Sequence, residues 1–256
     1  MRILVTNDDG VHAPGIAILE AIARQLSDDV WTVAPAEEQS GAGHSLTLAD
    51  PVRVRQLAPR RYAVRGTPTD SVMMAVGVVM KEAKPDLILS GINRGANLAE
   101  DVTYSGTVSA AMEGTLAGIR SIALSQAFGP EQGEHEPFDC AAFWGAKVIN
   151  ALLADAGPPG VLINVNFPAV APDSVQGIRV TEQGFHDYGR LVIKERRDMR
   201  GTPYYWFGLG PDSLTPGHET DLKAIREQFI SVTPLHLDLT HYPSIAGLRA
   251  ALAGVR

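Results

Sequence analysis

The first ten residues, MRILVTNDDG (residues 1–10), join an uninterrupted apolar strand to two adjacent carboxylates, and they decide the fold class. Residues 3–5 do not alternate with polar residues, which is typical of a parallel strand covered on both faces. In open α/β sheets, ligands bind beyond the carboxyl ends of such strands. The sequence therefore predicts that Asp8 and Asp9 lie at a ligand-binding edge of a sheet.

Composition indicates one folded domain, residues 1–256. Of the 256 residues, 45% are hydrophobic, which is sufficient for a buried core. The net charge is −7 and the Lys and Arg residues are dispersed, so we expect no binding of nucleic-acid polymers. No run approaches the ~18 apolar residues of a membrane-spanning helix. With a single cysteine, Cys140, and no signal-like amino terminus, we expect a cytoplasmic protein without internal disulfides.

Strands and helices alternate after the first strand, which predicts an α/β fold with a mostly parallel sheet and helices on both faces. Further buried strands are predicted at residues 30–34, 87–89, 122–124 and 161–166. Helices are predicted at residues 18–26, 105–113 and 138–153, and a further one starts within residues 66–70 and buries Val72, Met73, Val76, Val79 and Met80. Short alternating segments at residues 46–48, 52–54 and 62–64 predict an antiparallel excursion.

The carboxyl-terminal part no longer shows the alternation of strands and helices. Residues 178–180, 191–193 and 204–207 resemble strands of a hairpin around a charged loop, residues 195–201, and predict a projecting arm. A short helix is expected at residues 220–229, an extended segment at residues 231–235 and a last helix at residues 245–252. We therefore divide the chain into a parallel core, residues 1–170, and a β-rich extension, residues 171–256.

Polar residues follow several of the predicted strands, and parallel strands bring their carboxyl ends to one edge of the sheet. Asp8, Asp9, Ser40 and Asn93 are expected to converge there. Their oxygen atoms suit Mg²⁺ or Mn²⁺ and are poor zinc ligands. The same residues also have purely structural interpretations, because Asn, Asp, Ser and Gly are common in turns and at helix caps.

Ser105, Gly106 and Thr107 open a predicted helix. Backbone N–H groups at a helix start favour an anion, two hydroxyls add donors, and Gly106 permits close approach. A metal site beside an anion site predicts phosphate chemistry, in which a metal-activated water attacks phosphorus in line while Ser105 and Thr107 hold phosphate oxygens.

These motifs together resemble the survival protein SurE family of metal-dependent 5'/3'-nucleotidases. The resemblance spans residues 7 to 235 and rests on several short motifs in the same order. They are Asn7-Asp8-Asp9-Gly10, Gln39-Ser40-Gly41, Gly66-Thr67-Pro68, Ser90-Gly91-Ile92-Asn93 with Gly95 and Asn97, Ser105-Gly106-Thr107, and Ser231-Val232-Thr233-Pro234-Leu235.

The resemblance implies a Rossmann-like domain with a carboxyl-terminal segment swapped between subunits, in a homodimer or homotetramer. It implies hydrolysis of nucleoside 5'- and 3'-monophosphates, with short polyphosphate left open, and one divalent cation per subunit held by Asp8, Asp9, Ser40 and Asn93. Asp8 and Asp9 are then catalytic, and Asn97 joins residues 105–107 in binding the substrate.

Two further candidates and two alternatives stay open. His12 and His44 lie in the nearest loops and are secondary candidates for the general acid. Asp8 is an alternative nucleophile that would form an aspartyl-phosphate. A nucleotide-binding or sensing module without turnover would use the same residues.

Overall fold

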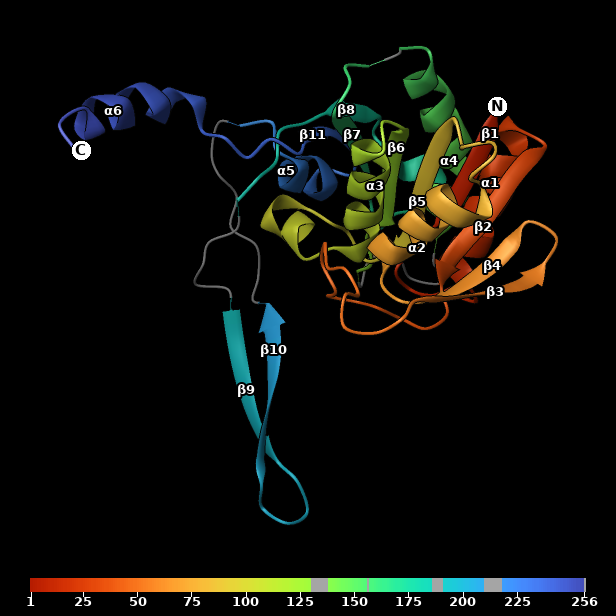
Figure 1. Ribbon diagram of the computed structural model, residues 1–256, viewed down its shortest axis with the longest axis horizontal. Coiled ribbons are helices and arrows are strands. Elements are labelled where there is room, and N and C mark those ends of the chain that lie inside the picture. The colour runs from red at the N-terminus through yellow and green to blue at the C-terminus, as the bar shows by residue number, and fades with distance from the viewer. Residues whose placement is uncertain (130–137, 156, 186–190, 210–217, 256) are drawn as a thin grey trace.

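The computed structural model describes residues 1–129, 138–155, 157–185, 191–209 and 218–255 (Figure 1). Its strands are β1 (Arg2–Thr6), β2 (Asp29–Pro35), β3 (Arg53–Ala58), β4 (Arg61–Arg65), β5 (Leu87–Arg94), β6 (Arg120–Gln126), β7 (Val161–Phe167), β8 (Ile178–Val180), β9 (Leu191–Arg197), β10 (Pro203–Leu209) and β11 (Ile230–His236). Its α-helices are α1 (Pro14–Leu26), α2 (Pro68–Met74), α3 (Gly106–Leu116), α4 (Asp139–Leu153), α5 (Asp221–Arg226) and α6 (Tyr242–Leu252). One π-helix, η1 (Ala75–Val79), and two 3-10 helices, η2 (Ala99–Thr103) and η4 (Pro172–Ser174), are also described.

Nine strands form one mixed sheet in the order β3-β4-β2-β1-β5-β6-β7-β11-β8. The six strands from β4 to β7 in this order are mutually parallel. The antiparallel pairs are β3 with β4 and β11 with β7. The predicted α/β fold with a mostly parallel sheet is confirmed.

Strand β1 lies at the centre of the sheet and is buried on both faces. Ile3 and Val5 belong to the larger hydrophobic core, whereas Leu4 belongs to a second core on the opposite face. Alternate residues of a strand point to opposite faces, so this apolar run contributes to both cores. Helices α1 and α4 pack on the first face and α2 and α3 on the second, as the view with α2 and α3 in front shows (Figure 1).

The segment between β2 and α2 differs from the prediction. Residues 46–48 form no strand, because the backbone N–H and hydroxyl of Thr47 donate to the Asp70 carboxylate at 3.1 and 2.5 Å. Strands β3 and β4 do form an antiparallel pair. Helix α2 begins after the N-cap Thr67, as predicted. Met73 is 46% exposed rather than buried, since the helix packs on the sheet along the side that carries Val72.

The carboxyl-terminal strands are distributed between two sheets. Strand β8 pairs with β11 inside the main sheet rather than with the hairpin. Strands β9 and β10 form the predicted hairpin, and residues 195–197 of the predicted loop continue β9 because they pair with residues 203–205. The helix expected at residues 220–229 ends at Arg226. Figure 1 shows the hairpin and α6 standing away from the sheet. None of the described helices is long and apolar enough to cross a membrane.

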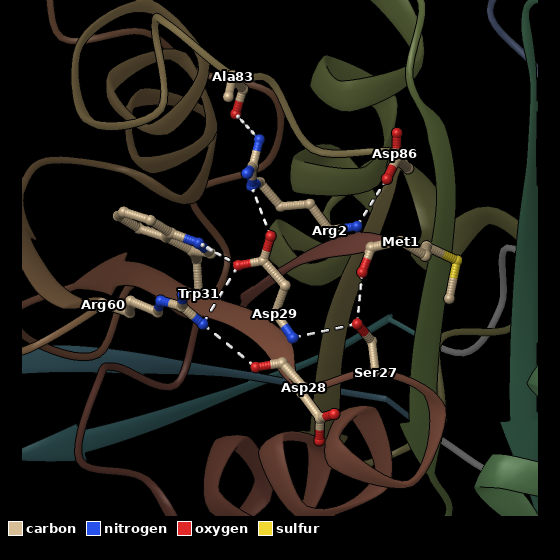
Figure 2. Close-up of polar contacts among 9 residues, drawn as sticks. All are labelled: Met1, Arg2, Ser27, Asp28, Asp29, Trp31, Arg60, Ala83 and Asp86. Carbon is tan, nitrogen blue, oxygen red and sulfur yellow. Dashed lines mark hydrogen bonds and ion pairs between the residues drawn. The ribbon is translucent and has the colours of Figure 1, made fainter.

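A polar network connects the amino-terminal ends of β1 and β2 (Figure 2). Asp8 follows the other end of β1, so the network lies at the opposite end of the sheet. The Asp29 carboxylate accepts a 2.9 Å hydrogen bond from Arg2 Nε and another of 2.9 Å from Trp31 Nε1, and Arg60 lies 3.3 Å away. The backbone N–H of Arg2 donates to Asp86 at 2.6 Å, which adds the segment before β5. Partial burial raises the pKa of Asp29, but Trp31, Arg2 and Arg60 lower it to below the ordinary value.

Replacing this carboxylate tests whether its charge stabilises the fold. We expect Asp29→Asn to lower the free energy of unfolding by about 1 kcal/mol at neutral pH. Because the pKa of Asp29 is lower in the folded state, this stabilisation is present above the unfolded-state pKa and is lost as the pH falls through the folded-state pKa. Urea unfolding of both proteins between pH 7 and pH 3 should therefore give converging curves, and a constant difference over that range would contradict the charge argument.

Candidate active site

The amino-terminal end of α3 packs directly on the Asp8 carboxyl group. Asp8 is 4% exposed and follows β1, and the hydroxyl of Thr107 donates a hydrogen bond to its Oδ1. A Cβ atom at Gly106 would lie 2.7 Å from Asp8 Cβ and 2.9 Å from Asp8 Oδ2. Only glycine permits this approach, which directs the positive end of the helix dipole toward the carboxylate.

The loop after β2 joins the same edge through its backbone. The N–H of Gln39 donates to the carbonyl of Asp8 at 2.8 Å, which places Ser40 one residue further along. Ser40 is exposed, and its hydroxyl donates to Glu38 at 2.8 Å. Since that bond uses the proton, the lone pairs of the Ser40 oxygen can still face a cation.

The end of β5 is linked to Asp9. The backbone N–H of Arg94 donates to Asp9 Oδ2 at 3.3 Å, so Asn93 lies beside the second carboxylate. Asn93 is half-buried, and its Nδ2 donates to the carbonyl of Gly95 at 2.8 Å. This bond orients the amide and leaves its oxygen for another partner. Hydrogen bonds thus connect all three loops that carry Asp8, Asp9, Ser40 and Asn93.

The two carboxylates are held in an environment that opposes their charge. Burial raises the pKa of Asp8 to about 6, which the Thr107 hydroxyl opposes and the charge of Asp9 reinforces. Burial also raises the pKa of Asp9, the backbone N–H of Arg94 lowers it, the charge of Glu38 raises it and the charge of Arg94 lowers it. Among the described residues, no Lys, Arg or His side-chain nitrogen lies within 4.0 Å of either carboxylate. Within the described ranges, neither carboxylate therefore has a cationic side chain in direct contact.

The donors at this edge fit a hard divalent cation. The set comprises two carboxylates, a hydroxyl and an amide oxygen, the ligand chemistry that Mg²⁺ and Mn²⁺ prefer. Three buried oxygens on the last residue of β1, the residue after it and the paired position of β5 have no hydrogen-bond partner within the described ranges, namely Thr6 Oγ1, Asn7 Oδ1 and Ser90 Oγ. In the described parts of the chain, no three His, Cys, Asp or Glu side chains are grouped to hold a metal. The donor set itself contains no His or Cys, which are the usual zinc ligands.

The three residues at the start of α3 have separate roles. Ser105 is the N-cap, and its oxygen accepts a 3.1 Å bond from the N–H of Val108, which leaves the hydroxyl proton free to donate elsewhere. The Thr107 hydroxyl is already directed at Asp8. An anion at this helix start would therefore be bound chiefly by backbone N–H groups and by Ser105.

Asn97, the other predicted substrate-binding residue, is held in a buried amide network. Its Nδ2 donates to Ser125 Oγ at 2.8 Å, and its backbone N–H donates to Asn166 Oδ1 at 2.8 Å. Its carbonyl accepts from Asn164 at 2.9 Å and from Asn166 at 3.1 Å. These bonds tie the loop after β5 to β6 and β7. Sequence reasoning missed this network because the amides on β7 look like ordinary strand residues.

The two histidine candidates differ in their surroundings. His12 is exposed on the turn before α1. His44 is also exposed, but its Nε2 lies 3.2 Å from Glu113 Oε2 on α3. The loop around His44 also lies against the end of η2, since a Cβ at Gly43 would lie 3.5 Å from the carbonyl of Thr103. Of the two, only His44 is oriented by a carboxylate among the described residues.

Comparison with known proteins identifies the family. The family model described as Survival protein SurE matches residues 3–190. The chain belongs to the SurE family. A protein named 5'-nucleotidase SurE from Erythrobacter litoralis is 61% identical over 94% of this chain and 96% of its own length. Another of that name from Rhizorhabdus wittichii is 59% identical over 98% of this chain and 99% of its own length.

The structures of the SurE family agree with this assignment. The crystal structure of a SurE protein from Aquifex aeolicus has a TM-score of 0.85 and 39% sequence identity to this chain. The match covers 98% of this chain and 99% of the Aquifex aeolicus chain. The resemblance to the SurE family that the sequence motifs indicated is therefore confirmed.

The contact between Gly106 and Asp8 predicts a specific defect in metal binding. We expect Gly106→Ala to displace Asp8 and to weaken Mn²⁺ binding by about tenfold or more, as changes beside metal ligands do. Gly77→Ala is the matched control, because a Cβ there has no neighbour within 4 Å. Calorimetric titration with Mn²⁺ measures both, and equal Mn²⁺ affinity in the two variants would show that the close approach has no role in binding.

Proposed function

We propose that this chain is a metal-dependent phosphomonoester hydrolase, a 5'-nucleotidase of the EC 3.1.3.5 class. The observation that carries the proposal is the position of Asp8, which belongs to the oxygen donor set and also lies against the start of α3. A cation site and an anion site therefore share one side chain. The names of the close relatives support the same activity.

In this proposal Asp8, Asp9, Ser40 and Asn93 hold one Mg²⁺ or Mn²⁺ per subunit. When bound, the cation supplies Lewis-acid chemistry, which activates water and neutralises charge on a phosphate. The protein contributes orientation. Thr107 fixes the rotamer of Asp8, the Arg94 N–H fixes Asp9, and the Gly95 carbonyl fixes Asn93.

The start of α3 binds the phosphate. Its first backbone N–H groups and the Ser105 hydroxyl, whose proton is not used in the cap bond, supply the donors. They hold the phosphate oxygens in place for in-line attack by water, and they stabilise the charge that these oxygens carry in the transition state. His44, oriented by Glu113, is the better placed of the two histidines to donate a proton to the leaving oxygen.

The proposed substrates are nucleoside 5'-monophosphates, with 3'-monophosphates and short polyphosphate as further substrates of the same site. An aspartyl-phosphate mechanism is less favoured, because one Asp8 oxygen accepts the Thr107 hydroxyl and its carboxyl group packs on Gly106. A nucleotide sensor without turnover would not need a cation donor set beside the anion site. A phosphate-release assay distinguishes the two, because a sensor would release no phosphate.

We also propose a homodimer or homotetramer in which the parts of the carboxyl-terminal extension that stand away from the sheet, the β9-β10 hairpin and α6, are exchanged between subunits, as the family resemblance implies for the carboxyl-terminal segment. The described hairpin supports this, because its aromatic side chains are uncovered in the single chain. Trp206 is 64% and Phe207 75% exposed. Helix α6 has no buried residue and likewise stands away from the core.

Removing either charge from the donor set tests the proposed activity. We expect Asp8→Asn and Asp9→Asn each to lower kcat by about a hundredfold or more, because a hard cation depends on anionic ligands. Asp28→Asn is the matched control, since this exposed carboxylate lies at the other end of the sheet. Phosphate release from nucleoside monophosphates with Mn²⁺ is the measurement. Full activity in either site variant, or turnover unaffected by excess chelator, would contradict the proposal.

A further inference from the structure

A hollow of about 490 Å³ opens beside the Ser40 loop and is separate from the cation donors. Side chains of the loop, of the segment that follows it and of the β3-β4 pair line it, including Glu37, Gln39, Thr47, Asp50, Arg53 and Arg65. Its volume falls within the range of small-molecule sites, which is about 300–1,000 Å³.

Two arginines on neighbouring strands line this hollow. Arg53 and Arg65 are directly opposed partners in the antiparallel β3-β4 register. Like charges in this position repel one another and destabilise a strand pair. Within the described part of the chain, neither guanidinium forms an ion pair or a side-chain hydrogen bond, and both residues are exposed. Their donors therefore remain available to a ligand.

The charges lining the hollow decide which ligand it suits. Arg53 and Arg65 are balanced by the carboxylates of Glu37 and Asp50, so the lining offers no net attraction to a second phosphate. It offers instead guanidinium groups as hydrogen-bond donors, carboxylates as acceptors, and the Gln39 amide, which can donate and accept. A neutral molecule rich in donors and acceptors matches this set, and guanidinium planes also stack on flat rings.

The hollow is connected to the cation donors by one residue. Gln39 lines it, and the backbone N–H of Gln39 donates to the carbonyl of Asp8 at 2.8 Å. Glu37 lines it too, and its carbonyl carbon would lie 3.3 Å from a Cβ at Gly10. The hollow therefore adjoins the loop that carries Asp8 and Asp9.

We propose that this hollow is the subsite for the nucleoside of the substrate, in which Arg53 and Arg65 bind the base and the carboxylates accept ribose hydroxyls. The inference rests on the phosphatase activity proposed above and deepens it. The two arginines then determine the preference for nucleotides over simpler phosphate esters, and they take no part in the hydrolysis step.

The test compares substrates that differ only in the base. Phosphate release is measured from the four common ribonucleoside 5'-monophosphates and from ribose 5-phosphate, with Mn²⁺, for wild type, Arg53→Ala and Arg65→Ala. Arg55→Ala is the matched control, because it removes the same charge from the same face of β3, two residues outside the hollow. Binding of adenosine and uridine, which lack phosphate, is measured separately by NMR.

We expect the Arg53 and Arg65 variants to lose about tenfold or more in kcat/KM for nucleotides, through KM, since each removes charge-assisted hydrogen bonds. Ribose 5-phosphate and the Arg55 variant should be unaffected. Unchanged nucleotide kinetics, or an equal loss for ribose 5-phosphate, would overturn the subsite. If the wild type releases phosphate from none of the esters, the proposed activity fails, and the subsite is then tested by nucleoside binding alone. Nucleoside binding by the wild type that is lost in both arginine variants would support the subsite. No nucleoside binding by the wild type would refute it.

Discussion

The contact between the Asp8 carboxylate and the start of α3 is the constraint on which the candidate site depends. The Thr107 hydroxyl fixes one oxygen of Asp8, and the missing side chain of Gly106 lets the helix approach the other. Burial of this carboxylate disfavours its charge and raises its pKa to about 6. A positive ion beside it would offset that cost, because opposite charge favours the ionised form. The same helix start then remains close enough to hold an anion.

The rest of the site is assembled by backbone hydrogen bonds from neighbouring strand ends. Gln39 donates to the Asp8 carbonyl and Arg94 to the Asp9 carboxylate, so the loops after β2 and β5 are fixed to the loop after β1. The amide network around Asn97 also fixes the loop after β5 to β6 and β7. At the other end of the sheet, Arg2 and Asp29 hold the strands in register. The donor positions therefore follow from the sheet itself rather than from flexible side chains.

Much of this arrangement is predictable from the sequence, because the signals are local. An apolar run before Asp8 identifies a central strand, and Ser105 with Gly106 identifies a helix start. Other features depend on contacts between distant segments. Thr47 pairs with Asp70 instead of entering a strand, β8 pairs with β11 instead of with the hairpin, and Asn97 bonds to β7. Nothing near these residues in the sequence distinguishes their partners.

The most direct test is a crystal grown with Mn²⁺ and phosphate and measured at the manganese absorption edge. The account predicts one anomalous peak per subunit, with Asp8, Asp9, Ser40 and Asn93 as ligands and a phosphate between the ion and the first N–H groups of α3. A manganese peak on another face of the sheet would contradict it. So would a phosphate held away from α3 while Asp8 bonds only to Thr107.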